Sequence, residues 1–173
     1  MRKLRVLLPV VGVLAGCGVG PAGPDSLAAT APTVTVSPRL YWVTADGKLR
    51  GVAPIGKAPA TTTTEYFVRQ LLSGPSQALV LEGLSSELPE FPEDEDVPIT
   101  VTAPVQGPVT VMLPPGLSRL DRTAVGQVTC TVWSAEAARR GSLAQVEVVL
   151  SSGGRRSGPH RCADFPTVAG PST

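Results

Sequence analysis

The sequence has few aromatic residues, a single histidine and only three cysteines. Aromatic side chains make up 4% of its 173 residues, and His160 is the one histidine. These absences exclude a metal centre built from several histidines or from a cluster of thiolates. Glycine and proline are plentiful instead, with 18 residues of each. The composition therefore indicates one domain with a modest aliphatic core and many loops.

No apolar run is long enough to cross a bilayer. The longest lies near the N-terminus, where Arg2, Lys3 and Arg5 precede about ten apolar residues, and a membrane-spanning helix needs about 20. This pattern is typical of a secretory signal peptide. The next segment, Leu14-Ala15-Gly16-Cys17, resembles the lipobox of bacterial lipoproteins. The resemblance implies cleavage before Cys17, acylation of that cysteine and anchoring at the extracytoplasmic face of the cell membrane; an ordinary signal peptide followed by an unrelated cysteine is the alternative.

The chain also lacks a strong excess of charge of either sign. Its formal net charge is +1, and removal of the signal peptide would leave a slight excess of acidic side chains. Neither a nucleic acid nor an anionic membrane surface is therefore indicated as a partner of the mature chain. We expect a signal peptide at 1–16, a lipidated, Pro- and Gly-rich tether at 17–38, one folded domain at 39–166 and a flexible tail at 167–173.

Two cysteines remain once Cys17 is assigned to lipidation. In an exported chain, Cys130 and Cys162 most simply form one disulfide. This bond would close a loop of about 33 residues, which stabilises by about 3–4 kcal/mol in the chain-entropy model. The alternative is a pair of free thiols with one redox-active member, but the sequence lacks the Cys-x-x-Cys spacing and a histidine next to either cysteine.

Hydrophobic periodicity predicts an α+β fold of order β-β-α-β-β-α-β. The turn at Asp46-Gly47 indicates a first hairpin, and Gly74-Pro75 ends the clearest helix, which begins with a capping box at 62–65. The predicted strands are 39–44, 49–52, 97–103, 108–113 and 143–150, and the predicted helices are 61–73 and 117–134, with a short helical turn at 76–82. We expect two layers, a small mixed β-sheet with both helices on one face.

Three short motifs occur in the order and spacing of a known family. They are Leu71-Leu72-Ser73-Gly74-Pro75, Gly83-Leu84-Ser85-Ser86-Glu87-Leu88-Pro89 and Ala124-Val125-Gly126-Gln127-Val128-Thr129-Cys130-Thr131. Together they resemble the sporulation and spore-germination (GerMN) domain over about Leu40 to Leu150. The resemblance implies a compact α/β module of Gram-positive envelope lipoproteins that binds or assembles rather than catalyses. Such proteins act in sporulation, in germination or in signalling beside a sensor kinase.

The sequence departs from this family pattern in two respects. The second hairpin of the family usually ends in Val-x-Asp-Leu, whereas here it ends in Val111-Met112-Leu113 without an acid. Many members also carry a further domain or a second copy, and this chain has neither. The Arg-rich, Asn-free composition suits a GC-rich actinobacterial genome.

No pattern in the sequence predicts catalysis. Ser157, His160 and Asp164 could be written as a triad, but they lie within eight positions of one Gly-rich tail, and triads normally draw on separate elements. A loop histidine beside a disulfide is the simpler interpretation. The acidic run at 90–96 could attract calcium, although it lacks the Gly and Glu positions of an EF-hand loop and fits a solvated loop better. We expect no catalytic residue, metal or cofactor.

Two pairs of arginines are candidates for an interaction surface. The pairs Arg139-Arg140 and Arg155-Arg156 flank the last predicted strand and could form one cationic rim for an anionic wall polymer or an acidic partner; a plain solvated surface is the alternative.

We therefore expect a non-enzymatic envelope protein that contacts an envelope or membrane protein, for example by strand addition at a sheet edge. The alternative is a binding module for a small molecule or a wall glycan. Its stacking residues would be Tyr41, Trp42 and Trp133, which core packing also explains.

Overall fold

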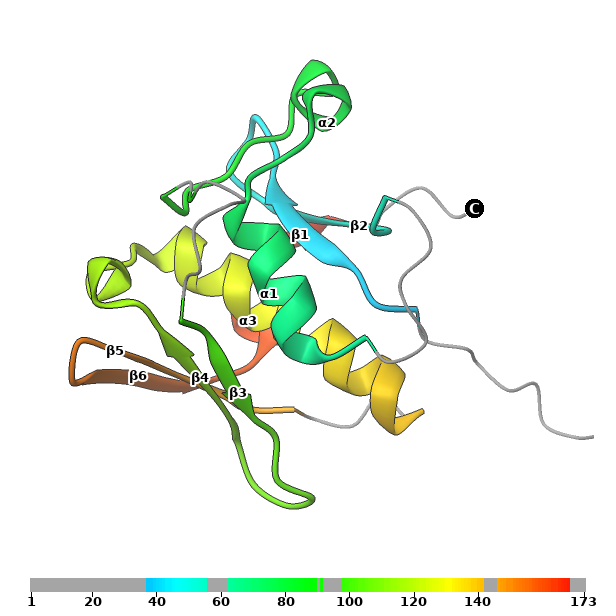
Figure 1. Ribbon diagram of the computed structural model, residues 1–173. Helices are drawn as coiled ribbons and strands as arrows, with labels where there is room; N and C mark the ends of the chain where they lie inside the picture. The colour runs from blue at the N-terminus through cyan, green and yellow to red at the C-terminus, as the bar shows by residue number, and fades with distance from the viewer. Residues whose placement is uncertain (1–36, 56–61, 90, 92–97, 142–145, 169–173) are drawn as a thin grey trace, which may run out of the picture. The chain divides into compact units, whose positions relative to one another are not determined.

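Two mixed β-sheets with helices packed against them form the α+β fold of the described residues, which are 37–55, 62–89, 91, 98–141 and 146–168 of a computed structural model (Figure 1). The chain divides into two compact units, Met1–Thr33 and Val34–Thr173, and every described residue belongs to the second. The predicted fold class is confirmed. The single predicted sheet is wrong, because the strands separate into one sheet of three and one of four.

The three-stranded sheet contains the predicted first hairpin. Strands β1 (Leu40–Val43) and β2 (Leu49–Val52) pair antiparallel, and Gly47 in the turn between them has a φ of 74°, which favours glycine. The third strand, β7 (Thr167–Val168), pairs parallel to β2. Thr167 and Val168 therefore belong to the folded unit, although we expected the flexible tail to begin at residue 167.

The four-stranded sheet has the order β3-β4-β5-β6. Its strands are β3 (Thr100–Thr102), β4 (Val109–Leu113), β5 (Val148–Ser152) and β6 (Arg155–His160). The central pair, β4 and β5, is parallel, and both outer pairs are antiparallel. Along β4, Val109, Val111 and Leu113 are buried, whereas Met112 is exposed. One face of this sheet therefore carries the core.

Helix α1 (Thr64–Leu72) forms where the sequence predicts it. Thr63 caps its N-terminus by accepting a hydrogen bond from the Tyr66 N–H. The carboxylate of Glu65 does not close the predicted capping box, because it accepts the Val101 N–H of β3 at 2.9 Å instead. The short helix α2 (Gln77–Leu81) follows at the position of the predicted helical turn.

Helix α3 (Arg122–Arg140) is longer than predicted and begins later. Its N-cap is Asp121, whose carboxylate accepts the Ala124 N–H at 2.7 Å, and it ends at Gly141 in the left-handed conformation. The 3₁₀ turn η2 (Pro115–Leu117) occupies the predicted helix start. Leu117 and Leu120 therefore precede α3 rather than belong to its buried face. The predicted boundaries 117 and 134 are both wrong.

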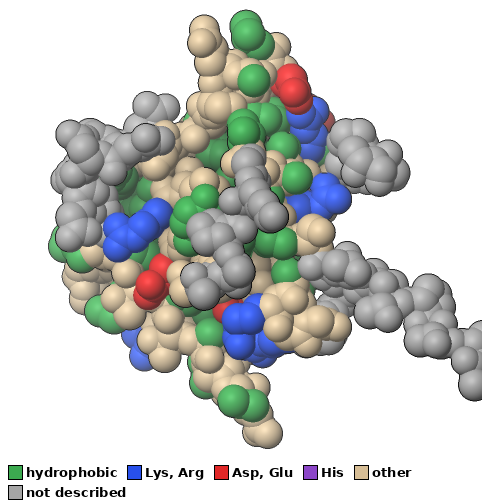
Figure 2. Space-filling model, turned by 45° about the vertical axis from the view of Figure 1, so that its right-hand side comes forward, with side chains coloured by type: hydrophobic (Ala, Val, Ile, Leu, Met, Phe, Trp, Pro, Cys, Tyr) green, Lys and Arg blue, Asp and Glu red, His purple; other side chains and the backbone are tan. Residues whose placement is uncertain are grey.

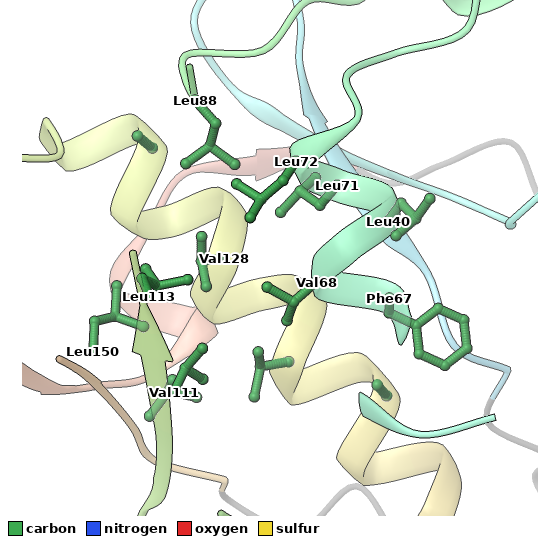
Figure 3. Close-up of a cluster of buried hydrophobic side chains, with 14 of the residues drawn as sticks. Leu40, Phe67, Val68, Leu71, Leu72, Leu88, Val111, Leu113, Val128 and Leu150 are labelled. Carbon is green, nitrogen blue, oxygen red and sulfur yellow. The ribbon is translucent and has the colours of Figure 1, made fainter. Parts of the chain in front are cut away.

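The main core lies between α1, α3 and the four-stranded sheet. Figure 3 shows Val68 of α1, Val128 of α3 and Val111 of β4 among the side chains that fill this space. A second cluster lies between α3 and the three-stranded sheet, and its buried members are Tyr41, Val43, Leu49, Cys130, Cys162 and Phe165. Because α3 contributes to both clusters, it is buried around most of its circumference.

Candidate functional site

The outer edge of β1 is hydrogen-bonded by side chains of α3. Ser134 Oγ accepts the Arg39 N–H at 2.9 Å, and Thr131 Oγ1 accepts the Tyr41 N–H at 3.1 Å. Gln127 Nε2 donates to the Tyr41 carbonyl at 3.1 Å. Residues 127, 131 and 134 lie on one face of a helix because of their spacing. This polar face takes the place of a neighbouring strand.

The loop after α2 covers the rest of this edge. Val43 and Ser85 exchange two backbone hydrogen bonds of 2.9 Å each. Gln127 joins the same loop to α3, because its Oε1 accepts the Glu87 N–H at 2.8 Å and its Nε2 lies 3.4 Å from Ser86 Oγ. The amide of Gln127 is fully buried. One side chain thus connects β1, the loop and α3.

Two other strand edges are also protected against strand addition. The Glu65 carboxylate accepts the hydrogen bond of the Val101 N–H of β3, as described above. Strand β6 is exposed along most of its length but carries Arg155, Arg156 and Pro159, and charges and proline discourage pairing with another strand. The edges formed by β1, β3 and β6 are therefore poor acceptors of a partner strand, and the fourth edge, β7, has only two residues.

A buried carboxylate joins the start of α1 to the end of α3. Glu136 is 1% exposed, and its oxygens accept hydrogen bonds from Thr64 Oγ1 at 2.5 Å and from Arg139 Nη2 at 2.6 Å. Arg140 Nε lies 3.3 Å away. Burial opposes ionisation, but the hydrogen bonds of Arg139 and Thr64 and the charges of Arg139 and Arg140 outweigh it. The pKa of Glu136 is therefore below its ordinary value.

We expect Glu136→Gln to lower the free energy of unfolding at pH 7 by about 1–2 kcal/mol, because two guanidinium groups lose their charged partner. Since the pKa of Glu136 is lower in the folded state, its ionised form adds stability above pH 4.5, and this contribution is lost as the pH falls through the folded pKa. Urea unfolding at several pH values measures the difference between the two proteins. A difference that stays constant down to pH 3 contradicts this role.

The two arginine pairs do not form a common rim. Arg139 and Arg140 lie in the last turn of α3 and bind Glu136. Arg155 and Arg156 line a cavity together with Val125 of the first turn of α3. Because a helix rises about 1.5 Å per residue, about 20 Å of helix separates the two places. The two arginine pairs, which flank the last predicted strand in the sequence, therefore lie near opposite ends of α3.

The predicted disulfide between Cys130 and Cys162 is confirmed. The two sulfur atoms lie 2.02 Å apart, and both residues are buried. The bond attaches the 3₁₀ turn η3 (Cys162–Asp164) to α3. It also holds Phe165 against the helix at Gly126, where an added Cβ would lie 2.8 Å from the Phe165 ring. Free thiols at these two positions are excluded.

Only two of the three residues of the possible triad meet. Ser157 Oγ lies 2.8 Å from His160 Nε2 on the exposed strand β6. Asp164 instead caps η3, where its Oδ2 accepts the Arg161 N–H at 2.8 Å. His160 therefore lacks an orienting carboxylate among the described residues, which fits the simpler interpretation of a histidine beside the disulfide.

The three aromatic candidates separate into two environments. Trp42 is 1% exposed and belongs to the core. Tyr41 and Trp133 both line a cavity of about 580 Å³, together with Arg161 and Asp164. Burial raises the pKa of Tyr41, and the charge of Arg39 partly offsets the rise. The sequence alone did not show which aromatic residues share a cavity.

An apolar surface surrounds α2, and sequence reasoning missed it. Ile55, Val80 and Leu81 are 68%, 54% and 83% exposed, and we call them the α2 surface. Ile55 and the buried Leu79 of α2 line a cavity of about 330 Å³. Figure 2 shows hydrophobic side chains gathered near the top of the view, where α2 lies. Periodicity could not reveal this surface because α2 is only five residues long.

Several predicted features lie outside the described residues. These are the signal peptide, Cys17, the tether up to residue 36 and most of the acidic run at 90–96. Within the described ranges, no three histidine, cysteine or acidic residues are grouped so that they could hold a metal ion. No helix there has the length and apolarity that a membrane span requires. Comparisons with family models, curated proteins and solved structures gave no match.

Proposed function

We propose that this protein is a non-enzymatic, lipid-anchored protein of the cell envelope whose folded unit binds another envelope or membrane protein. The observation that carries the proposal is the α2 surface. Val80 and Leu81 expose large apolar side chains on α2, and Ile55 lines a cavity to which α2 contributes Leu79; such side chains favour a protein contact because their burial is favourable. The lipobox at residues 14–17 supports the membrane anchor.

The resemblance to GerMN domains supports a binding role. The three motifs behind it meet at one place: Leu72, Leu88 and Val128 share the main core. Gln127 of the third motif hydrogen-bonds the Glu87 N–H of the second. The motifs thus describe a structural junction and not a set of reactive groups. This arrangement fits a module that binds rather than catalyses.

The chemistry of the α2 surface suggests the kind of contact. Strand addition is disfavoured at the edges of β1, β3 and β6, which favours a contact through side-chain packing at the α2 surface. The ion pair between Arg50 and Glu82 borders α2 and supplies a polar rim. The surface therefore fits a partner segment with two or three apolar side chains and a polar border.

We expect Leu81→Asp to reduce recovery of the partner by about tenfold, because a charge would replace an apolar contact at the most exposed residue of the surface. The measurement is crosslinking in intact cells, followed by mass spectrometry of the proteins recovered with this chain. Leu81 is 83% exposed, so the variant should fold normally.

Val105→Asp is the matched control. Val105 is 95% exposed in the turn between β3 and β4, which Figure 1 places at the opposite end of the fold from α2. A Cys17→Ala variant, which would lose the anchor, controls for membrane attachment. Equal loss of the partner in Val105→Asp and Leu81→Asp, or no loss in either, contradicts the assignment to the α2 surface.

A binding module for a small molecule or a wall glycan is the second candidate. The observation in its favour is the cavity that Tyr41 and Trp133 line together with Arg161 and Asp164. Aromatic rings and polar groups at one cavity suit a ligand with both apolar and hydroxylated faces. Recovery of wall fragments alone in the crosslinking experiment, with no protein partner, favours this candidate over the first.

A further inference from the structure

A third cavity, of about 440 Å³, lies where the β5–β6 hairpin meets η2 and the start of α3. Figure 1 shows this hairpin beside the chain segment that leads into α3. The volume is within the range of about 300–1,000 Å³ that small-molecule sites occupy. Its apolar lining, which we call the apolar floor, consists of Leu113, Leu117, Leu120, Val125 and Leu150. The cavity is separate from the α2 surface.

A tight turn holds the hairpin over this floor. Gly153 and Gly154 have φ values of 54° and 76°, as a two-residue hairpin turn with both residues left-handed requires. A Cβ atom on Gly153 would lie 3.5 Å from Ser118 Cβ and 3.7 Å from Pro115 Cα. The tip of the hairpin therefore packs against η2. This contact fixes the positions of the residues that follow the turn.

Three arginines line the cavity, and we call this site the arginine pocket. They are Arg119, which follows η2, and Arg155 and Arg156 of β6. The side chains of all three are exposed, and no hydrogen bond or ion pair joins any of their guanidinium groups to another described residue, although the backbones of Arg155 and Arg156 pair with β5. By contrast, Arg139 binds Glu136. The three guanidinium groups are therefore available to a ligand.

Asp121 is the one carboxylate among the described residues that line the pocket, and it is already engaged. Its Oδ1 accepts the Ala124 N–H at 2.7 Å as the N-cap of α3. Three positive charges thus face one negative charge. Ser118 and Ser157 add hydroxyl groups to the lining. The pocket combines an excess of positive charge with an apolar floor.

We propose that the arginine pocket binds an amphiphilic anion. Its phosphate or carboxylate headgroup would contact the arginines, and its short carbon chain would lie on the apolar floor. Guanidinium groups bind both headgroups through paired hydrogen bonds, and the floor favours a chain by the hydrophobic effect. A membrane lipid and a free soluble amphiphile share this chemistry. The proposal is independent of the proposed protein partner, because the two surfaces use different residues.

Hexyl phosphate is the probe, titrated into the full chain by isothermal titration calorimetry. We expect one bound molecule per chain and about fifteenfold weaker binding of butyl phosphate, since each of the two lost methylenes reduces the affinity about fourfold. Hexanol, which lacks the charge, should not bind. The proposal is overturned if inorganic phosphate binds as tightly as hexyl phosphate, or if hexanol does.

Single arginine variants test where the anion binds. Arg156→Ser and Arg119→Ser, on different elements, should each weaken hexyl phosphate binding at least about fivefold. Lys48→Ser is the matched control, because it removes one exposed positive charge from the β1–β2 turn, and it should change the affinity less than twofold. Thermal unfolding verifies that the variants are folded. Unchanged affinity in both arginine variants overturns the proposal.

Vesicles distinguish the two sources of the anion. The Cys17→Ser chain, which would lack the lipid anchor, is floated with phosphatidylcholine vesicles that contain or lack phosphatidylglycerol. Binding that needs phosphatidylglycerol and is lost in Arg156→Ser assigns a lipid headgroup. Binding of hexyl phosphate without binding to vesicles assigns a free ligand. Binding of neither probe overturns the proposal.

Discussion

Replacing Gln127 with Met is expected to lower the free energy of unfolding by about 2–4 kcal/mol. The two side chains are similar in volume, so the loss comes from the hydrogen bonds. The Tyr41 carbonyl and the Glu87 N–H lose their partners at 3.1 and 2.8 Å. The Tyr41 carbonyl is buried, so leaving it unsatisfied costs about 1–3 kcal/mol, whereas the partly buried Glu87 N–H loses a hydrogen bond worth about 1 kcal/mol. Urea unfolding followed by circular dichroism measures the change.

Gln77→Met is the matched control, because it makes the same chemical change at an exposed position of α2. We expect it to alter the free energy of unfolding by less than about 0.5 kcal/mol. If Gln127→Met costs no more than this control, the amide of Gln127 does not hold β1, the loop and α3 together.

Removing the disulfide is expected to have an effect of similar size. Cys130→Ala with Cys162→Ala, made in a Cys17→Ser background to prevent exchange between thiols, should lower the free energy of unfolding by about 3–4 kcal/mol, because the unfolded chain gains the freedom of the opened loop. The sequence separation is 32 residues. Guanidinium unfolding of the oxidised parent and the variant measures this difference.

The loss should be concentrated at the C-terminal end of the fold. Strand β7 has two residues, and its neighbour η3 is attached to α3 through Cys162. Amide hydrogen exchange should therefore speed up most at Thr167 and Val168 and least in α1. Uniform acceleration across both helices would falsify the idea that the bond mainly secures this end. Mild reduction of the parent protein should reproduce the pattern and serves as the control.

Local sequence signals located most elements but not the limits of α3. Asp121 and Gly141 are ordinary cap residues, yet the apolar spacing of Leu117 and Leu120 favoured an earlier start. A helix with one buried face has a clear periodicity, whereas α3 is buried on several sides between α1 and both sheets. Its buried Thr129 and Thr131 look polar in sequence. The true extent of α3 therefore depends on tertiary contacts.

The strands after residue 151 were missed for a related reason. Strand β6 is exposed and contains Gly158 and Pro159, so it shows no alternation. Its pairing with β5 depends on the Gly153-Gly154 turn and on long-range contacts. The missed long-range contacts also affected the prediction of the arginine pocket. Arg155 and Arg156 were recognised as candidates, but Arg119 was not. Only the folded chain brings a residue after η2 to a hairpin that lies more than 30 positions later.

The contact between α3 and the edge of β1 has a consequence for how such a domain can diverge in evolution. Gln127, Thr131 and Ser134 bind main-chain atoms of β1, and every residue type except proline supplies the same N–H and carbonyl groups. These hydrogen bonds therefore do not restrict which residue types β1 can carry, apart from proline, and only side-chain packing does. A change at any of the three helix positions removes a bond that no strand residue can replace. Substitutions in β1 that keep its buried packing should thus be tolerated better than substitutions on this face of α3 that remove a hydrogen-bonding group.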